Sequence, residues 1–321
     1  MVTSSPRDYK KVILVGNPNV GKSVIFRLLT GSYVMVSNFP GTTVEVSRGR
    51  THIGETEFEI IDTPGVNSLI PQSEDEWVAC EILLREKPDL IVQVADAKNL
   101  RRTLLITSQL VEFGIPTVLV LNMIDEAEDR GIEIDSQGVS RFFSIPVVET
   151  IAIYGKGRKQ LLNALSNTRR PRNPLAELYA GEKVIQELDG IASPAFLSAE
   201  WIAENNRDLT RTLAGHIGEE AMSRLKERQA NYHAEGHGNP VRKIGEIRNS
   251  MLDTAVALFK KKRRDRFTDE TGSFRKLWIS LLFLGLALFA WNEFGALLGI
   301  PTPFALLRDA VEKKLDASLD A

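Results

Sequence analysis

The chain has 321 residues, 43% of them hydrophobic and 26% charged, which is the composition of a globular protein with enough apolar material for two domains. Its formal net charge of -2 gives no overall basic field, so composition does not favour nucleic acid as a partner. The single cysteine, Cys80, excludes an intramolecular disulfide and any cysteine-rich metal site.

Residues 10–168 alternate short apolar runs with amphipathic segments. The runs predict strands of a parallel sheet that helices cover on both faces, because they are rich in β-branched residues and lack a polar face. They occupy residues 12–16, 58–62, 90–96, 117–122 and 145–150. Helical spacing followed by glycine or charge predicts helices over 22–31, 76–86 and 100–114. We therefore expect a doubly wound, mostly parallel α/β domain over 10–168.

The segment GNPNVGKS, residues 16–23, directly follows the first predicted strand. G-x-x-x-x-G-K-S between a strand and a helix is a phosphate-binding loop, in which backbone N–H groups and the helix N-terminus face phosphate oxygens. We expect Lys22 to reach the β- and γ-phosphates of a nucleotide and Ser23 to offer its hydroxyl oxygen to Mg²⁺. The residues expected to line the nucleotide here are Gly16, Asn17, Pro18, Asn19, Val20, Gly21, Lys22 and Ser23.

The segment SNFPGTTVE, residues 37–45, lies between this loop and the next predicted strand. A threonine placed here can add a second hydroxyl to Mg²⁺ only while a γ-phosphate is present, so the loop would be ordered by the triphosphate and released after hydrolysis. We expect Thr43 to be this switch threonine and Thr42 to be the alternative, with Gly41 beside them at the phosphates.

The segment IIDTPG, residues 60–65, carries the next two groups. Asp62 ends an apolar strand, where its carboxylate can hold the Mg²⁺ shell through water. Gly65 can offer its backbone N–H to the γ-phosphate. A plain strand-to-turn sequence is the alternative, because aspartate, proline and glycine are common in turns.

The segment LNMID, residues 121–125, predicts which base is bound. Its Asp125 can accept hydrogen bonds from N1–H and the exocyclic N2–H₂ of guanine together, a donor pair that adenine lacks. We expect Asn122 to tie this loop to the phosphate-binding loop and to contact guanine N7. GTPases commonly have lysine where Met123 stands, and methionine can also cover the base face. The backbone N–H of Ala152 is expected to meet the guanine oxygen.

These motifs, each at the end of a predicted strand, have one economical explanation: a Mg²⁺-dependent P-loop GTPase that binds GTP and GDP. A soluble ribosome- or RNA-associated GTPase is the alternative. That class usually appends a basic module of KH or OB type. No basic, aromatic-rich module of that kind follows residue 168, so we do not expect nucleic acid among the partners.

The motifs, with the stretch at 94–135 and GKGRKQLL, together resemble the G domain of the ferrous iron transport protein B (FeoB) family. The resemblance covers residues 10 to about 165. After a basic, proline-broken linker it continues loosely over 175–262, which read as helices only and resemble the family's helical GDP-dissociation-inhibitor-like domain. The resemblance implies a slow GTPase in the regulatory cytosolic part of a ferrous iron uptake system. The family's transporters continue into a long membrane domain, so we expect this chain to be truncated after its first apolar segment.

The resemblance also implies roles for single residues. Asn19 matches the asparagine that coordinates K⁺ in potassium-activated members, where K⁺ supplies the charge of an arginine finger; the alternative is that Asn19 only closes the loop by hydrogen bonds. Val66 stands where many small GTPases have a water-positioning glutamine, which predicts slow turnover. Asp75 and Glu76 either couple the second switch, the segment after Gly65, to the helical domain or lie on a solvated helix face.

A run without charges at 277–291 would be about 22 Å long as a helix, against about 30 Å for the hydrocarbon core of a bilayer. It reaches the required length only by continuing to residue 300 past Asn292 and Glu293. We predict a membrane helix over 275–300 and a tail over 301–321. The alternative is a helix packed on a partner or in the protein's own core.

A membrane helix would place the chain at the cytoplasmic membrane with the G domain facing the cytoplasm, because the basic cluster at 260–266 precedes the apolar run. The expected partners are a membrane permease subunit or a small iron-uptake accessory protein. Homo-oligomers through the membrane helix are also expected.

Overall fold

The computed structural model describes residues 9–31, 34–175, 194, 197–198, 200, 207–234, 240–262, 266–297, 299 and 303–319. The chain divides into two compact units, Met1–Arg263 and Arg264–Ala321.

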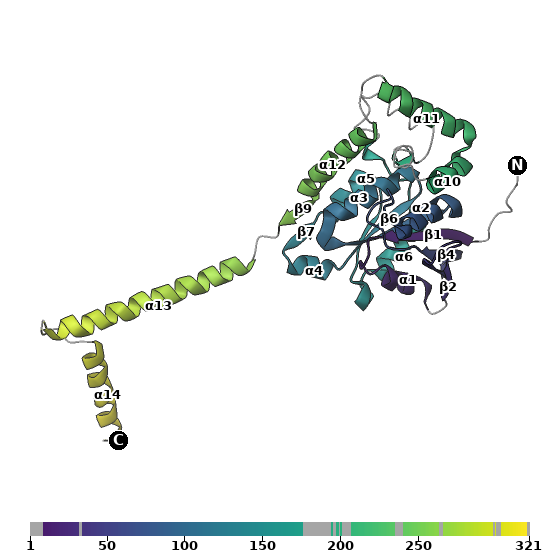
Figure 1. The fold of residues 1–321 in the computed structure, drawn as a ribbon. Coiled ribbons are helices and arrows are strands. Elements are labelled where there is room, and N and C mark those ends of the chain that lie inside the picture. Colours follow the sequence, from purple (N-terminus) through teal and green to yellow (C-terminus); the bar gives the residue numbers. More distant parts are fainter. Residues whose placement is uncertain are drawn as a thin grey trace. The chain divides into compact units, whose positions relative to one another are not determined.

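The first unit is built around a seven-stranded sheet with the strand order β2-β3-β4-β1-β5-β6-β8 (Figure 1). Its strands are β1 (Tyr9–Gly16), β2 (Val34–Asn38), β3 (Glu45–Ile53), β4 (Thr56–Asp62), β5 (Leu90–Asp96), β6 (Thr117–Asn122) and β8 (Val147–Glu149). β1 pairs in parallel with β4 and β5, β5 with β6, and β6 with β8, while β2 and β3 form an antiparallel hairpin at one edge. All five predicted strands are therefore confirmed, and the mixed sheet is that of a P-loop G domain.

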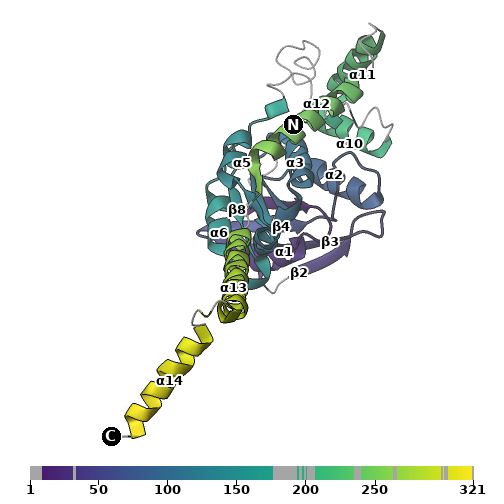
Figure 2. The same ribbon diagram turned by 90° about the vertical axis from the view of Figure 1, so that its left-hand side faces the viewer.

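Helices cover both faces of this sheet (Figure 2). The strand β1 shows why: Val12 and Leu14 belong to one apolar cluster, Ile13 and Val15 to another, and all four are fully buried. The first cluster contains residues of α1 (Lys22–Thr30) and α6 (Arg158–Ser166). The second contains residues of α2 (Glu74–Glu86) and α3 (Leu100–Leu110). The remaining short elements on these faces are η1 (Ala97–Asn99), η2 (Val111–Phe113), α4 (Ile124–Asp129), α5 (Ser136–Phe143) and η3 (Ala152–Tyr154).

The helices after the linker share their core with the sheet domain. In the described part of the first unit these helices include α10 (Arg207–Ile217), α11 (Glu219–Ala234) and α12 (Pro240–Phe259). α10 packs on α2, and α12 packs on α3. Leu213 joins the α2 cluster and Leu252 the α3–α5 cluster, both fully buried. The predicted helical character of this region holds for its described helices up to Phe259, and the buried leucines explain why they dock on α2 and α3.

The last residues of the first unit form a strand that the sequence did not predict. β9 (Lys260–Lys262) pairs antiparallel with β7 (Ile132–Ile134), and Asp135 N donates to Phe259 O at 2.9 Å. The three lysines come from the basic cluster that we expected to precede a membrane segment. Their backbone is used here in a two-stranded sheet.

The second unit consists of α13 (Arg266–Leu297) and α14 (Pro303–Leu319). In the part of the chain that the structure describes, no helix is both long and apolar enough to cross a membrane. The predicted membrane helix over 275–300 is therefore not supported. The physical reason lies in the length of the uncharged run, which falls short of the hydrocarbon core at about 1.5 Å per residue. The predicted tail is largely helical, and it begins at a proline, which is favoured in the first turn of a helix.

Candidate nucleotide-binding site

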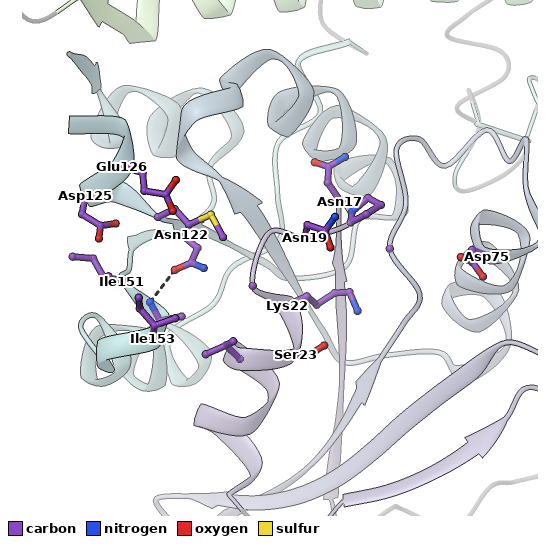
Figure 3. Close-up of a pocket in the computed structure, with 16 residues that line it drawn as sticks. Asn17, Asn19, Lys22, Ser23, Asp75, Asn122, Asp125, Glu126, Ile151 and Ile153 are labelled. Atoms are coloured by element: carbon purple, nitrogen blue, oxygen red, sulfur yellow. Dashed lines mark hydrogen bonds between the residues drawn. The ribbon is translucent and has the colours of Figure 1, made fainter. Parts of the chain in front are cut away.

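A pocket of about 500 Å³ opens at the carboxyl ends of the parallel strands, where ligands bind in doubly wound folds. Figure 3 shows Lys22 and Ser23 at one end, Asp125 and Glu126 at the other, and Asn122 between them. Its lining residues are Asn17, Pro18, Asn19, Gly21, Lys22, Ser23, Val24, Gly65, Asp75, Asn122, Met123, Asp125, Glu126, Ile151, Ala152 and Ile153.

The structure thus brings together most of the residues that the sequence motifs predicted. The predicted residues outside this lining are Gly16, Val20, Gly41, Thr42, Thr43 and Asp62. Sequence reasoning missed Val24, Glu126, Ile151 and Ile153, although each directly follows or flanks a motif residue. Asp75, which we expected either to couple domains or to lie in solvent, is exposed and lines the pocket.

The phosphate-binding loop owes its shape to two glycines. A Cβ on Gly16 would lie 2.1 Å from Val94 O, so the end of β1 can pass β5 only without a side chain. Gly21 has φ of 85°, the left-handed conformation that turns the chain into α1. The loop is also tied to the segment after β4, because Asn17 Nδ2 donates to Val66 O at 3.0 Å and Val66 N donates to Gly16 O at 2.9 Å.

Lys22 lies against the end of β4. Its Nζ donates to Asp62 Oδ1 at 2.5 Å and also to Thr63 O. Ser23 Oγ is 3.4 Å from Asp62 Oδ2. Burial raises the pKa of Asp62 above its ordinary value, and the Lys22 ammonium opposes that rise. A hydroxyl and a desolvated carboxylate side by side are hard oxygen ligands of the kind that Mg²⁺ prefers, so these residues fit the predicted magnesium site.

Asn122 links its own loop to the phosphate-binding loop, as its motif predicted, and also to the loop after β8. It is 3% exposed, and its Nδ2 donates to Val20 O at 2.9 Å. Its Oδ1 accepts from Thr150 Oγ1 at 3.0 Å. The same oxygen accepts from Ala152 N at 2.9 Å, the dashed line in Figure 3. The Ala152 N–H that we expected to meet the guanine oxygen therefore donates to Asn122 in this structure. The cause is the short connection after β8, which places residues 150–152 directly against the end of β6.

The comparisons with known proteins agree with this geometry. The family model described as ferrous iron transport protein B matches residues 10–165. A solved structure of the cytosolic domain of L. pneumophila FeoB is 30% identical, and the match covers 78% of this chain and 100% of that chain with a TM-score of 0.60. The chain belongs to the FeoB family.

Two further relatives show what part of a FeoB protein the chain resembles. A variant of S. thermophilus NFeoB, solved with GDP bound, is 27% identical, and the match covers 78% of this chain and all of that chain with a TM-score of 0.64. A Porphyromonas gingivalis fusion of Fe(2+) transport protein A and the Fe(2+) transporter FeoB is 40% identical over 51% of this chain. The matched region is 20% of that relative's length, so the chain spans a minor part of the curated relative. These findings do not favour the ribosome- or RNA-associated alternative.

In this FeoB-family chain the expected switch threonine does not reach the pocket. Thr43 is exposed in the turn that joins β2 to β3. The turn is closed by Phe39 N, which donates to Val44 O at 2.8 Å, and by Thr42 N and Thr42 Oγ1, which both donate to Phe39 O at 3.0 Å. The hairpin pairing continues directly into β2 and β3, and this pairing keeps Gly41, Thr42 and Thr43 away from the pocket.

The segment after Gly65 is held by α2 and α3. Glu76 is buried, and its carboxylate accepts from Asn67 N at 3.0 Å and from Gln72 N at 2.9 Å. Gln109 Oε1 accepts from Leu69 N at 2.8 Å. On the same helix α2, Glu81 Oε1 accepts from Thr212 Oγ1 of α10 at 3.0 Å. Glu76 is therefore not on a solvated face, and one helix contacts both the second switch and the helical region.

Proposed function

We propose that the chain binds GTP and GDP and hydrolyses GTP slowly, as the cytosolic regulatory part of a ferrous iron uptake system. One observation carries this proposal: a single pocket joins the phosphate-binding Lys22 to the guanine-reading Asp125 at the carboxyl edge of the sheet. The GDP bound to the S. thermophilus relative supports the choice of nucleotide.

The residues of the pocket divide the chemistry between them. Lys22 and the backbone N–H groups of its loop would neutralise the β- and γ-phosphates, once the Lys22 ammonium leaves Asp62. Ser23 and Asp62 would hold Mg²⁺, which would offset the negative charge of the phosphates. Thr43 would join them after the hairpin turn opens. Val66 is fully buried and cannot orient an attacking water, which supports slow turnover without a partner.

A potassium ion is the proposed second cation. Asn19 lines the pocket in the phosphate-binding loop, and its carboxamide offers a hard oxygen ligand for such a cation. We expect phosphate release in KCl to exceed that in NaCl about tenfold at equal ionic strength, equivalent to about 1.4 kcal/mol of barrier. Asn19→Ala should remove this difference and leave GDP affinity mostly intact. Equal rates in the two salts would reject the potassium role.

The remaining assignments follow from the family. Residues 10–168 would form the G domain and 175–262 a helical domain resembling a GDP-dissociation inhibitor, which α2 connects to the second switch. The chain would act at the cytoplasmic membrane beside a permease subunit or a small iron-uptake accessory protein.

Base selectivity tests the central proposal. Asp125→Asn should shift preference from GDP toward xanthosine diphosphate, because the new amide can donate to the additional carbonyl of xanthine. Asp129→Asn is the matched control, since Asp129 lies exposed on the same helix α4 and outside the pocket lining. Competition binding of the two diphosphates measures the shift. Unchanged GDP preference in Asp125→Asn would remove this carboxylate from the base site.

A further inference from the structure

A lysine from a neighbouring strand end lies against the base-reading loop. The sheet register pairs Asp96 with Asn122, so the residues that follow β5 and β6 are neighbours. Lys98, in η1, is 10% exposed at its side chain. Its Nζ lies 2.5 Å from Glu126 Oε2, 3.5 Å from Met123 Sδ and 3.5 Å from Asp96 Oδ1.

The charges around this ammonium are mostly negative. Asp125 and Glu126 both line the base end of the pocket, and Asp96 lies behind them at the end of β5. Asp125 must remain free to accept hydrogen bonds from the base. An unpaired Glu126 carboxylate would repel the Asp125 carboxylate. Lys98 is placed to offset both Glu126 and Asp96.

The third contact concerns the base face itself. Met123 has φ of 59° and lines the pocket, and its Sδ is within reach of the Lys98 ammonium. Lysine is common at position 123 in GTPases, where its stem covers the base. Here the apolar cover and the positive charge come from two residues on adjacent strand ends.

We propose that Lys98 is a positioning residue for guanine: it holds Met123 across the base face and neutralises Glu126, the charge that would otherwise oppose Asp125. This inference rests on the proposed nucleotide-binding function. Lys98 thus supplies, from a neighbouring strand end, the positive charge that a lysine at position 123 would carry. Lys98 acts on binding and not on phosphate chemistry, because the pocket residues that it contacts, Met123 and Glu126, belong to the base-reading loop and its helix.

The test uses Lys98→Met, which keeps the length of the side chain and removes its charge. We expect GDP affinity to fall about fivefold and KM for GTP to rise by the same factor, with kcat at saturation unchanged. Lys98→Arg should retain most of the affinity. Lys159→Met, an exposed lysine on α6, is the control and should change neither.

A charge rescue separates this role from a purely structural link between η1 and α4. In Lys98→Met, adding Glu126→Gln should recover at least half of the lost GDP affinity, because it removes the carboxylate left without its cation. A structural link would not be restored by this second change. Loss of kcat with unchanged KM, unaltered GDP affinity in Lys98→Met, or no rescue would overturn the proposal. Absence of GDP binding by the unmodified chain would instead reject the proposed function.

Discussion

Arg248 of α12 forms a buried ion pair with Glu112 of η2, with Nη2 2.6 Å from Oε1 and both side chains almost fully buried. Its Nη1 lies 2.7 Å from both carboxylate oxygens of Glu200. Glu112 Oε2 also accepts from Leu197 N at 2.9 Å. The guanidinium of α12 therefore joins Glu200 to Glu112 of η2, and the Glu112 carboxylate in turn holds the backbone of Leu197.

Replacing this guanidinium should be costly. Arg248→Met removes a cation that contacts two buried carboxylates, and we expect it to lower the free energy of unfolding by about 3 to 5 kcal/mol. Arg101→Met is the matched control, because Arg101 of α3 pairs with Asp253 of α12 at 2.8 Å in an exposed position. It should cost less than about 1 kcal/mol. Urea unfolding of the two variants measures the contrast, and equal losses would show that burial does not govern this contact.

The same triad predicts a pH dependence. Burial raises the pKa of Glu112 from its ordinary 4.5 to about 7, with Arg248 opposing the rise. At a pH between these two pKa values, Glu112 keeps its proton in the folded protein but has lost it in the unfolded chain. The contribution of Glu112 to stability therefore falls as pH rises from about 4.5 to 7. We therefore compare the free energy of unfolding of the unmodified chain with that of Glu112→Gln at pH 5 and at pH 8. The difference in favour of the unmodified chain should be larger at pH 5 by about 1 to 3 kcal/mol. Urea titrations at both pH values test this, with the exposed Glu246→Gln as control, and a difference of the opposite sign would contradict it.

The contact between two loops of the pocket makes one glycine irreplaceable. Gly21 has φ of 85°, and a Cβ there would lie 2.4 Å from Asn122 Nδ2. Gly21→Ala should displace Asn122, which holds Val20 O and Ala152 N, and should lower GDP affinity at least tenfold. Gly31 has φ of 71° but nothing within 4 Å of its added Cβ. Gly31→Ala therefore also places an alanine at a positive φ but without the clash, and isothermal titration should show nearly normal GDP affinity for it. Similar losses in both variants would assign the effect to strain alone.

The parts that sequence predicted are those governed by local pattern. Buried parallel strands such as β5 read as continuous apolar runs, and the phosphate and base loops follow directly from their ends. The hairpin of β2 and β3 was missed because β2 is exposed on both faces and so has no hydrophobic alternation. β9 was read as a basic cluster because its three lysines give no strand signal, and only pairing with the distant β7 makes it a strand.

The contacts of the site were harder to predict than its residues. The motif at 121–125 indicated Asn122 and Asp125 but not Lys98, which contacts Met123 and Glu126 and whose position depends on the register between β5 and β6. Thr43 was predicted at the phosphates, whereas turn hydrogen bonds of Phe39 and Thr42 keep it in the hairpin. Such contacts depend on tertiary pairing, which a single sequence does not specify.

An edge-to-face contact connects the hairpin turn that carries Thr43 to α2, the helix that holds the segment after Gly65. The rings of Phe39, in the hairpin turn, and Trp77, on α2, lie 6.1 Å apart at an interplanar angle of 85°. Phe39 is largely buried in this contact. Bringing Thr43 to Mg²⁺ requires the turn to open, so Phe39 must move relative to Trp77.

Thr43 and Phe39 should therefore have opposite effects on triphosphate binding. Thr43→Ala removes a ligand used only with the γ-phosphate, so affinity for a nonhydrolysable GTP analogue should fall about tenfold while GDP affinity stays unchanged. Phe39→Ala weakens the closed hairpin and should raise the affinity for the analogue relative to GDP. Trp77 supplies the readout: its emission should change when the analogue binds to the unmodified chain, and Trp77→Phe should abolish that change. If Thr43→Ala weakens GDP and the analogue equally, Thr43 is not the switch threonine, and Thr42→Ala is then the variant expected to separate the two nucleotides.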